Sequence, residues 1–458
     1  MKLVELDYIT EPARVFAGMA DRPWSVFLDS GRERSTSARF DIFTADPYLT
    51  LTTRGLRTEI ASRDERRVSE EDPLALLQEL LGDPVEAPAQ LPFPGGAIGY
   101  FAYDLGRRYE RWPSHAADDI GLPEVAVGLY DWAVIIDHEL RQSWIIGHGR
   151  DARTLAEWDR RIECLSALAL QPRVPFEVLS DVRSNLDRAA YDAAFDRIKQ
   201  HIRAGDCYQV NLTQRFSARV SGSSWSAYER LRAVNPAPYS AYINLPEGQV
   251  LSSSPERFLR VAQGRAITQP IKGTRPRRSD ATADAALAAE LRQSGKDRAE
   301  NVMIVDLLRN DLGKSCKAGS VRATKMFDVE SFANVHHLVS TIEGVPAAGC
   351  HALDLLRDCF PGGSITGAPK VRAMQIIEEC EPHRRGVYCG AIGYVGFDGT
   401  MDTNIAIRTL VRTGDQLYAW AGGGIVADSD VDSEYQESLD KASGLLTVFA
   451  NEDVSAAV

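Results

Sequence analysis

Residues 187–220, DRAAYDAAFDRIKQHIRAGDCYQVNLTQRFSARV, contain a helix pattern followed at once by a strand pattern. Asp187 is a suitable N-cap, and Gly205 is a suitable helix stop. Between them, apolar residues recur at spacings of four, three and four, at Tyr191, Phe195, Ile198 and Ile202. Alternate residues after the glycine are also apolar, at Tyr208, Val210, Leu212, Phe216 and Val220. This change of period within one short segment predicts mixed α and β structure.

The first 150 residues are dominated by strand patterns rich in Val, Ile, Tyr and Trp. The expected strands lie at 24–28, 47–52, 97–103, 124–136 and 143–147. A helix is predicted over 151–169, with Asp151 as its N-cap. The following segment, 171–186, has two prolines and no clear period, which indicates a boundary between an N-terminal β-rich region, 1–175, and a second region, 186–450.

Composition excludes some classes of protein. The 458 residues carry 52 Lys and Arg against 64 Asp and Glu, a formal net charge of −12. A nucleic-acid binder normally shows a basic surface or a high pI, so this balance argues against one. A local basic site for a small anion stays compatible with an acidic chain.

Cysteine usage and hydropathy indicate the compartment. The seven cysteines form an odd, scattered set without a C-x-x-C pair, so neither a disulfide framework nor a zinc cluster is expected. The N-terminal residues lack the apolar core of a signal peptide, and the most apolar stretch, 124–136, is interrupted by Asp131. We therefore expect a cytoplasmic protein that does not span a membrane.

One sequence element occurs twice. GAIGYFAYD (96–104) and GAIGYVGFD (390–398) share five leading residues and a terminal Asp. Either a duplicated strand or chance could produce this similarity, and the sequence alone does not choose between them.

The segment TQPIKGTRPRR (268–278) is the first candidate for chemistry. Lys272 lies between an apolar residue and a glycine, with Arg275 and two further arginines nearby. Burial and cationic neighbours favour the neutral amine, which is the form of lysine that attacks carbon. The alternative is an ordinary basic surface loop.

Two expected helices contribute carboxylates. In 296–312, Glu300 continues an apolar stripe, where it is either an edge residue or a buried acid that needs a cation. In 432–446, Glu437 and Lys441 have the spacing of an exposed ion pair. If the helices met, Glu300 and Glu437 would form an oxygen site suited to Mg²⁺.

Other polar residues and glycine-rich turns are less specific. Gln209 lies on the polar face of the 208–220 strand, which is either solvated or part of a binding site. Glu256 follows a proline in SSSPERF. The turn GGSITGAPK (362–370) lacks the Lys-Ser/Thr of a phosphate loop, although it leads into a helix at 369–380, and AGGGIV (421–426) could bring backbone N–H groups close to a ligand.

Taken together, these segments resemble the chorismate-utilising enzyme family. The matching segments are GDCYQVN (205–211), SPERF (254–258), PIKGTRPR (270–277), AENVMIVDLLRNDL (299–312), VHHLVS (335–340), PGGSITGAPKVRAM (361–374), YCGAIGY (388–394), TNIAIRT (403–409), AGGGIV (421–426) and ESLDKA (437–442). They occur in family order. The resemblance implies an α+β fold of two orthogonally packed antiparallel sheets flanked by helices, with the N-terminal strands interleaved into one body.

Two residues are informative within the family. Isochorismate and salicylate synthases carry a lysine base where this chain has Gln209, and anthranilate synthases carry alanine where it has Lys272. The chain is therefore most similar to the aminodeoxychorismate synthase branch, which converts chorismate and ammonia to 4-amino-4-deoxychorismate on the route to p-aminobenzoate and folate. The alternatives are an anthranilate synthase and a non-catalytic, tryptophan-binding regulatory subunit.

The resemblance also implies roles for individual residues. Lys272 would form a covalent intermediate with chorismate, Glu256 would act as the acid, and Glu300 and Glu437 would hold Mg²⁺. The expected substrate-binding residues are Gln209, Gly273, Thr274, His337, Tyr388, Arg408, Gly422, Gly423, Gly424 and Lys441.

The resemblance also implies a partner subunit and a second small-molecule ligand. A separate glutamine amidotransferase subunit is expected to supply ammonia, since the chain shows no glutaminase nucleophile. A second pocket that holds tryptophan in relatives would be lined here by Ser30, Ser37, Ala38, Arg39, Phe40, Pro238, Tyr239 and Ser240.

Overall fold

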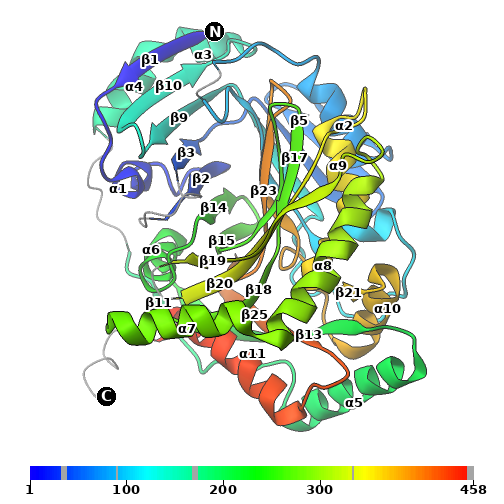
Figure 1. Ribbon diagram of the computed structural model, residues 1–458. Coiled ribbons are helices and arrows are strands. Elements are labelled where there is room, and N and C mark those ends of the chain that lie inside the picture. The colour runs from blue at the N-terminus through cyan, green and yellow to red at the C-terminus, as the bar shows by residue number, and fades with distance from the viewer. Residues whose placement is uncertain (32–38, 89–90, 168–173, 333–334, 451–458) are drawn as a thin grey trace.

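The computed structural model describes residues 1–31, 39–88, 91–167, 174–332 and 335–450. Two large antiparallel sheets face each other, and helices cover their outer sides (Figure 1). The expected α+β class with two antiparallel sheets is confirmed. The predicted boundary between regions 1–175 and 186–450 stays a prediction. Strands from both of these regions occur together in each sheet.

The first sheet has 13 strands among the described residues. In spatial order they are β1 (Lys2–Leu6), β10 (Gln142–Gly147), β9 (Trp132–Asp137), β3 (Phe40–Thr44), β2 (Ser25–Asp29), β14 (Tyr239–Leu245), β15 (Gly248–Ser254), β24 (Thr409–Thr413), β25 (Gln416–Ile425), β13 (Gln209–Ser221) and β11 (Glu177–Val178), with β12 (Arg183–Ser184) and β21 (Gly367–Ala368) also paired to β13.

The second sheet has 12 strands in the described part of the chain. Their order is β18 (Ile271–Pro276), β20 (Val335–Gly344), β17 (Arg265–Gln269), β16 (Arg257–Ala262), β23 (Met401–Ile405), β22 (Ala391–Gly396), β7 (Gly96–Phe101), β8 (Val125–Tyr130), β4 (Leu49–Arg54), β5 (Arg57–Ser62) and β6 (Arg66–Ser69), with β19 (Arg322–Ser331) on β20. Since β2 pairs with β14 and β7 pairs with β22, both sheets contain strands from both ends of the chain.

The helices lie on the outer faces of the sheets. They are α1 (Pro12–Ala17), α2 (Pro73–Leu81), α3 (Ala152–Ala156), α4 (Trp158–Ala167), α5 (Arg188–Ala204), α6 (Ser224–Val234), α7 (Ala281–Gln293), α8 (Gly295–Gly313), α9 (Ala352–Cys359), α10 (Lys370–Cys380) and α11 (Val431–Leu446), with 3₁₀ turns η1 (Tyr103–Arg108), η2 (Gly363–Ile365) and η3 (Thr447–Phe449). Helices α6 and α11 pack on the first sheet, and α7 and α8 pack on the second. Within the described ranges, no helix is long and apolar enough to cross a membrane.

The period-2 pattern of the strands divides the core into layers. Val26 and Ile42 point into the core between the sheets, whereas their neighbours Phe27 and Phe43 pack under the helices that cover the first sheet. Helix α5 adds a smaller cluster, in which Tyr191 and its stripe meet the start of β13.

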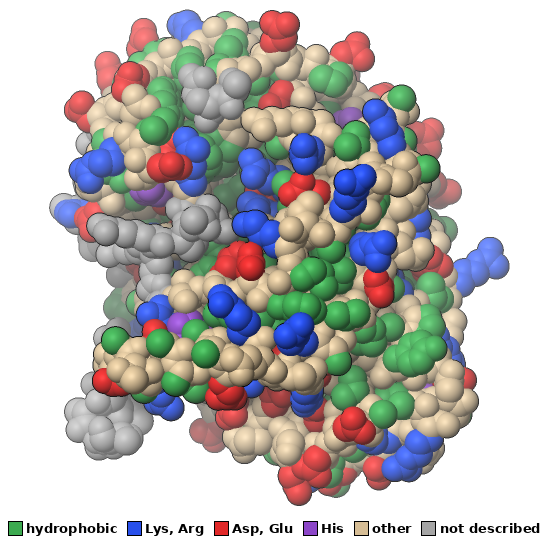
Figure 2. Space-filling view, in the orientation of Figure 1, with side chains coloured by type: hydrophobic (Ala, Val, Ile, Leu, Met, Phe, Trp, Pro, Cys, Tyr) green, Lys and Arg blue, Asp and Glu red, His purple; other side chains and the backbone are tan. Residues whose placement is uncertain are grey.

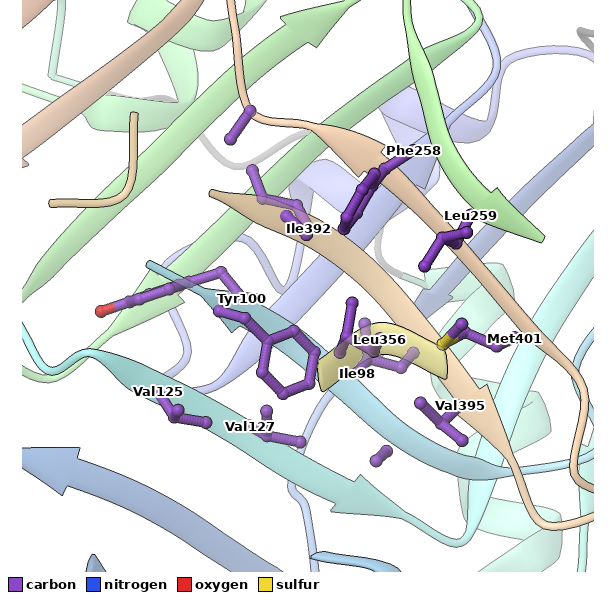
Figure 3. Close-up of a cluster of buried hydrophobic side chains, with 14 of the residues drawn as sticks. Ile98, Tyr100, Val125, Val127, Phe258, Leu259, Leu356, Ile392, Val395 and Met401 are labelled. Atoms are coloured by element: carbon purple, nitrogen blue, oxygen red, sulfur yellow. The ribbon is translucent and has the colours of Figure 1, made fainter. Parts of the chain in front are cut away.

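The two GAIGY elements are paired with each other. Strand β7 lies antiparallel to β22, with Gly99 opposite Gly393. Side chains from both strands, including Ile98, Tyr100 and Ile392, enter one buried cluster at the centre of the second sheet (Figure 3). A Cβ on Gly99 would lie 2.0 Å from the Ala126 carbonyl oxygen, so this close strand contact requires glycine.

Three local predictions were wrong in detail. Segment 124–136 is two strands, because the chain changes sheets at Asp131, whose buried carboxylate accepts backbone N–H bonds from residues 149–151. Within 151–169, the described residues form two helices on either side of Glu157. Tyr208 precedes β13 and is 73% exposed, so it does not share the buried face of the strand. The caps at Asp151, Asp187 and Gly205 are confirmed.

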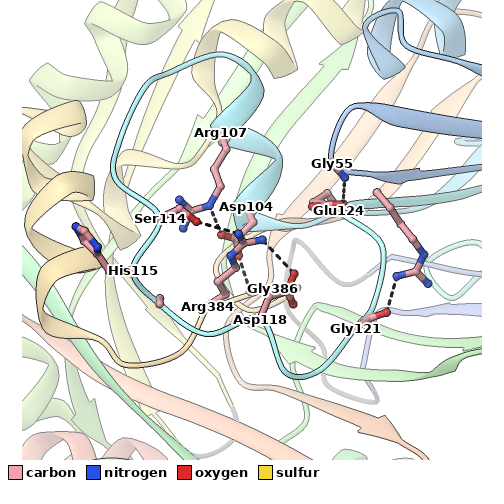
Figure 4. A network of polar contacts seen from close by, with 12 residues as sticks. Gly55, Asp104, Arg107, Ser114, His115, Asp118, Gly121, Glu124, Arg384 and Gly386 are labelled. Carbon is pink, nitrogen blue, oxygen red and sulfur yellow. Dashed lines mark hydrogen bonds and ion pairs between the residues drawn. The ribbon is translucent and has the colours of Figure 1, made fainter.

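A polar network ties the loop after β7 to the segment before Tyr388 (Figure 4). Asp104 accepts the Gly386 N–H at 2.9 Å, and Arg384 donates to Asp118 at 3.0 Å. Next to it, buried Arg385 is paired with Glu381 and donates to two backbone carbonyls, those of Asn211 and Ile365. The network therefore holds the start of β13 and turn η2 together.

Candidate active site

The site lies where the chain passes between the two sheets. Glu256 connects β15 of the first sheet to β16 of the second, and Arg408 connects β23 of the second to β24 of the first. Backbone hydrogen bonds of 3.0 Å join the two crossings, from Ile405 N to Glu256 O and from Ser253 N to Arg408 O. Residues at such crossings lie outside the alternation of either sheet.

Ser364 connects Lys272 to Glu256. Lys272 Nζ, from β18, donates to the Ser364 carbonyl oxygen at 3.0 Å. The Ser364 hydroxyl donates to Glu256 Oε1 at 2.5 Å. Turn η2 therefore holds an amine and a carboxyl group at one site, although 92 and 108 residues separate them from Ser364 in the sequence.

Burial brings the two groups toward their uncharged forms. Glu256 is 5% exposed, and burial raises its pKa to about 7, although the Ser364 hydroxyl and Lys272 act in the opposite direction. Burial also lowers the pKa of Lys272, against the nearby carboxylates. A protonated acid beside a neutral amine is the arrangement that covalent catalysis by lysine needs.

The expected help from the neighbouring arginines is not seen. Arg275 is paired with Glu290 and Asp297, at 3.0 and 3.1 Å, and Arg277 is paired with Asp284. Their charges are neutralised along β18, so burial lowers the pKa of Lys272 and the arginines do not. The simple alternative of a basic surface loop is also excluded, since the Lys272 side chain is partly buried and bonded to η2.

Gln209 lies in the protein interior, which resolves the choice left open by the sequence. The residue is fully buried at the start of β13, so this end of the polar face is not solvated, whereas Arg219 further along the same face is exposed. Its Nε2 donates to Asn211 Oδ1 at 2.9 Å, and Asn211 Nδ2 donates to the Ser364 carbonyl oxygen at 3.2 Å. Gln209 is thus connected to the same oxygen that accepts from Lys272.

A second group of polar residues surrounds Thr274, further along β18. The Thr274 hydroxyl shares a 2.9 Å hydrogen bond with His337 Nδ1. Burial and the charge of Arg408 lower the pKa of His337 to about 3, so the ring is neutral. Arg408 Nη1 donates to Asn235 Oδ1 at 2.9 Å, and burial lowers the pKa of Arg408. Among the described side chains, Asn235 is the one bonded to this half-buried guanidinium, which therefore suits an incoming carboxylate.

The other expected substrate residues supply shape. Tyr388 is buried and stacks on Trp420, with ring centroids 5.6 Å apart. Gly273 has φ of +80°, and a Cβ there would lie 2.8 Å from Asp297 Cγ, so a larger residue is strained and blocked.

The glycine run of β25 makes room for charged side chains. A Cβ on Gly423 would lie 3.1 Å from Glu434 Oε2 and 3.4 Å from Glu437 Oε1. Lys441 pairs with Glu437 at 2.6 Å and donates to the Gly422 carbonyl at 3.2 Å. Gly422 and Gly424 face β13, where they pair with Thr213 and Asn211.

Glu300 of α8 completes this acidic group. Burial raises its pKa, Lys272 and Lys296 lower it, and the charge of Glu437 raises it further, so the two acids are close enough to interact. Burial likewise raises the pKa of Glu434. Oxygen donors that repel one another and are only partly neutralised suit a divalent cation. Among the described residues, no three His, Cys, Asp or Glu side chains converge as a complete metal cluster, so a cation here would need further oxygen ligands.

The expected tryptophan-site residues lie elsewhere, around a cavity of about 500 Å³. The cavity lies between the sheets, and Lys272 is not among its lining residues. The predicted residues that line it are Ser30, Arg39, Phe40, Pro238, Tyr239 and Ser240. Ser37 and Ala38 lie outside the described residues.

Sequence reasoning missed Ser364, Asn211, Asn235 and Glu434 as contributors to this site. Ser364 was visible only as part of a glycine-rich turn, and Asn211 only as a polar strand residue. Glu434 shares a helix face with Glu437 at i and i+3, a signal that could have included it. Asn235 gave no signal.

Comparison with known proteins identifies the family to which this chain belongs. The family model described as chorismate binding enzyme matches residues 26–447, and the chain belongs to that family.

Particular members of the family are similar over nearly their whole length. Aminodeoxychorismate synthase component 1 of Salmonella typhimurium is 48% identical over 98% of this chain and 100% of its own. The protein of the same name from Escherichia coli is 47% identical over 94% of each chain. The crystal structure of anthranilate synthase component I from Streptococcus pneumoniae, 33% identical, covers 91% of this chain and 94% of its own with a TM-score of 0.80.

Proposed function

We propose that the protein converts chorismate and ammonia to 4-amino-4-deoxychorismate and water, as one component of p-aminobenzoate synthesis. The observation that carries this proposal is the joining of Lys272 and Glu256 through Ser364. The near full-length similarity to aminodeoxychorismate synthase component 1 supports it.

In the proposed first step, neutral Lys272 attacks C2 of chorismate. The two ring double bonds shift, the C4–O bond breaks, and protonated Glu256 gives its proton to the leaving hydroxyl, which departs as water. The lysine nitrogen loses one proton after the bond forms, and this proton returns to the Glu256 carboxylate. Glu256, with a pKa raised to about 7, can supply the first proton near neutral pH.

In the second step, ammonia attacks C4. The double bonds shift back, the bond between C2 and the lysine nitrogen breaks, and the proton lost by the added nitrogen passes through Glu256 to the departing lysine nitrogen. The lysine returns as a free amine, so the protein is unchanged after each turnover. Arg408, Thr274, His337 and Tyr388 would bind the substrate during both steps.

The donor set fits Mg²⁺, which commonly takes one or two carboxylates and keeps other positions for water or substrate. Glu300 and Glu437 would hold the ion. When bound, the ion would offset the negative charge of the ring carboxylate. The Gly422–Gly424 backbone leaves space beside these acids.

The proposal includes a partner and a location. A glutamine amidotransferase subunit would deliver ammonia, which agrees with the word component in the names of the relatives. A cytoplasmic location is consistent with unpaired cysteines, since all six that the structure describes are free.

Tryptophan is proposed as the ligand of the 500 Å³ cavity. Arg39 and Phe40, together with Pro238, Tyr239 and Ser240, supply charged and apolar parts of its wall. Calorimetric titration of L-tryptophan into the wild-type protein, and into a Tyr239→Ala variant that removes a side chain from the cavity wall, tests this assignment.

Product identification tests the proposed function. The protein is incubated with chorismate, Mg²⁺ and ammonium, and products are separated with and without the lyase that converts 4-amino-4-deoxychorismate to p-aminobenzoate. Lyase-dependent p-aminobenzoate is expected. Fluorescent anthranilate formed without a lyase would show the alternative activity, and loss of turnover in folded Glu300→Ala would exclude a purely regulatory role.

A further inference from the structure

A buried lysine of α5 binds the turn that joins β25 to α11. The Lys199 side chain is 8% exposed. Its Nζ atom donates to three backbone carbonyls of the turn, those of Val426 at 3.2 Å, Ser429 at 2.9 Å and Ala427. An ammonium group has three N–H donors and no acceptor, so the turn satisfies all of them.

The turn and one aromatic ring stabilise the buried charge of this lysine. Acidic side chains lie at the surface over α5 and α11 (Figure 2), and none of the described acids forms an ion pair with Lys199. The ring centroid of Phe195, one helical turn earlier, is 5.6 Å from Nζ. Burial of a charged amine is unfavourable without partners, so the carbonyl groups of residues 426–429 are essential to it.

A chain of hydrogen bonds connects this turn to Glu434. Val426 N donates to the Ser429 hydroxyl at 3.0 Å, and the hydroxyl donates to Glu434 Oε1 at 2.6 Å. A backbone N–H can only donate, so it directs the one hydroxyl hydrogen of Ser429 to the carboxylate. The backbone that Lys199 binds therefore sets the position of Glu434 Oε1.

The other oxygen of Glu434 lies beside Glu437. A Cβ on Gly423 would lie 3.1 Å from Glu434 Oε2 and 3.4 Å from Glu437 Oε1, so these two oxygens border the same glycine. Carboxylates this close repel each other, and the charge-assisted bond from Ser429 offsets that repulsion at Glu434.

Helix α11 has other contacts that hold it against α5. The two helices lie side by side (Figure 1). The ring centroids of Tyr191 and Tyr435 are 5.0 Å apart, and the Arg188 guanidinium donates to Asp432 in the first turn of α11. Loss of the buried lysine should therefore loosen the turn and leave α11 in place.

We propose that Lys199 is a positioning residue for the proposed Mg²⁺ site. It fixes the 426–429 turn, and Ser429 of that turn directs Glu434 toward Glu437. This inference rests on the proposed function, because it assumes that the acidic group binds a divalent cation. Carboxylates that are held in place before binding lose less conformational freedom when the cation arrives, so they bind it more tightly.

Calorimetric titration of Mg²⁺ into the substrate-free protein tests this inference. Lys199→Met removes the ammonium group from a side chain of similar length, and Ser429→Ala removes the hydroxyl that bonds to Glu434. Each variant should raise the dissociation constant of Mg²⁺ about tenfold, as expected for groups that orient a metal ligand. The variant with both changes should bind Mg²⁺ about as weakly as either single variant, because both residues act through the same chain of hydrogen bonds.

Arg412 supplies a matched control. It is a half-buried cation that donates to the carbonyls of Gly222 and Gly414, at 2.6 and 3.1 Å. It lies opposite Leu417, at the other end of β25 from the glycine run. Arg412→Met should lower the free energy of unfolding, as Lys199→Met should, because buried carbonyls lose their donors, but it should leave the Mg²⁺ dissociation constant unchanged.

Urea unfolding identifies any variant that does not fold. Lys199→Gln, which removes the charge but keeps two N–H donors, replaces Lys199→Met in that case. It should also raise the Mg²⁺ dissociation constant, by a smaller factor, because part of the turn stays bonded.

The outcomes distinguish this inference from the proposed function. An unchanged Mg²⁺ affinity in the folded Lys199 variant overturns the inference, and so does an equal loss of affinity in Arg412→Met. Factors that multiply in the double variant also overturn it, because they would show that Lys199 and Ser429 act separately. A wild-type protein that binds no Mg²⁺ would instead refute the Mg²⁺ assignment, and one that binds Mg²⁺ but forms no product from chorismate and ammonium would refute the proposed function alone.

Discussion

Removing the Ser364 hydroxyl should extend activity to higher pH. This hydroxyl donates to Glu256 Oε1 at 2.5 Å and thereby favours the ionised carboxylate, which holds the pKa of Glu256 lower than burial alone would place it. Ser364→Ala removes that bond but keeps the backbone oxygen that binds Lys272 Nζ. A hydrogen bond to a charged group contributes about 1.5 kcal/mol, so the pKa of Glu256 should rise by about one unit above its value of about 7.

The sign follows from the proposed role of Glu256 as an acid. Activity requires its protonated form, so kcat/KM for chorismate falls as pH rises through its pKa, and in Ser364→Ala that fall should occur about one pH unit higher. The assay keeps neutral ammonia constant at every pH, because ammonium itself titrates. Ser252→Ala is the control, since this buried hydroxyl bonds to Thr409 instead of Glu256. An alkaline limb that stays in place, or moves to lower pH, would refute the reasoning.

Three further outcomes are expected. Gly424→Ala should reduce turnover at least about tenfold, measured with ammonium, because the new Cβ would lie 2.3 Å from Gln209 Nε2; normal turnover in a folded variant would contradict this. Raising the pH from 5.5 to 7.5 should make Glu256→Gln more stable relative to wild type by about 2 kcal/mol, because a carboxyl whose pKa is raised from 4.5 to about 7 loses its stabilising contribution as pH rises through that range. Urea unfolding of both proteins at both pH values measures this change. A stability difference that is the same at both pH values would show that the pKa of the carboxyl is not perturbed. Arg385→Met should destabilise the fold by about 3–5 kcal/mol, because it leaves the Glu381 carboxylate buried without its guanidinium partner. Urea unfolding should show that the double variant, with Glu381→Gln added, recovers part of the lost free energy of unfolding.

Much of the local structure was predictable because it depends on neighbouring residues. The caps at Asp187 and Gly205 and the stripe between them are set by helical period and by the chemistry of short side chains. The identity of Lys272 and Glu300 as unusual residues also came from their immediate surroundings. Prediction failed where tertiary contacts set the local structure. Asp131 ends one strand because three backbone N–H groups from residues 149–151 converge on its carboxylate.

The site shows the same division. The sequence by itself determined the α+β class, the family resemblance and the residue types available for chemistry, since period, composition and motif order are all local. Only the tertiary structure decided that Gln209 is buried, that the arginines beside Lys272 are neutralised, and that Ser364 joins amine, carboxyl and amide. The contacts of Ser364 connect residues 92 to 153 positions apart, and they exist because the chain crosses repeatedly between two sheets. A local sequence pattern contains no information about contacts between such distant residues. The direction of each pKa shift, which depends on burial and on these contacts, therefore became known only with the fold.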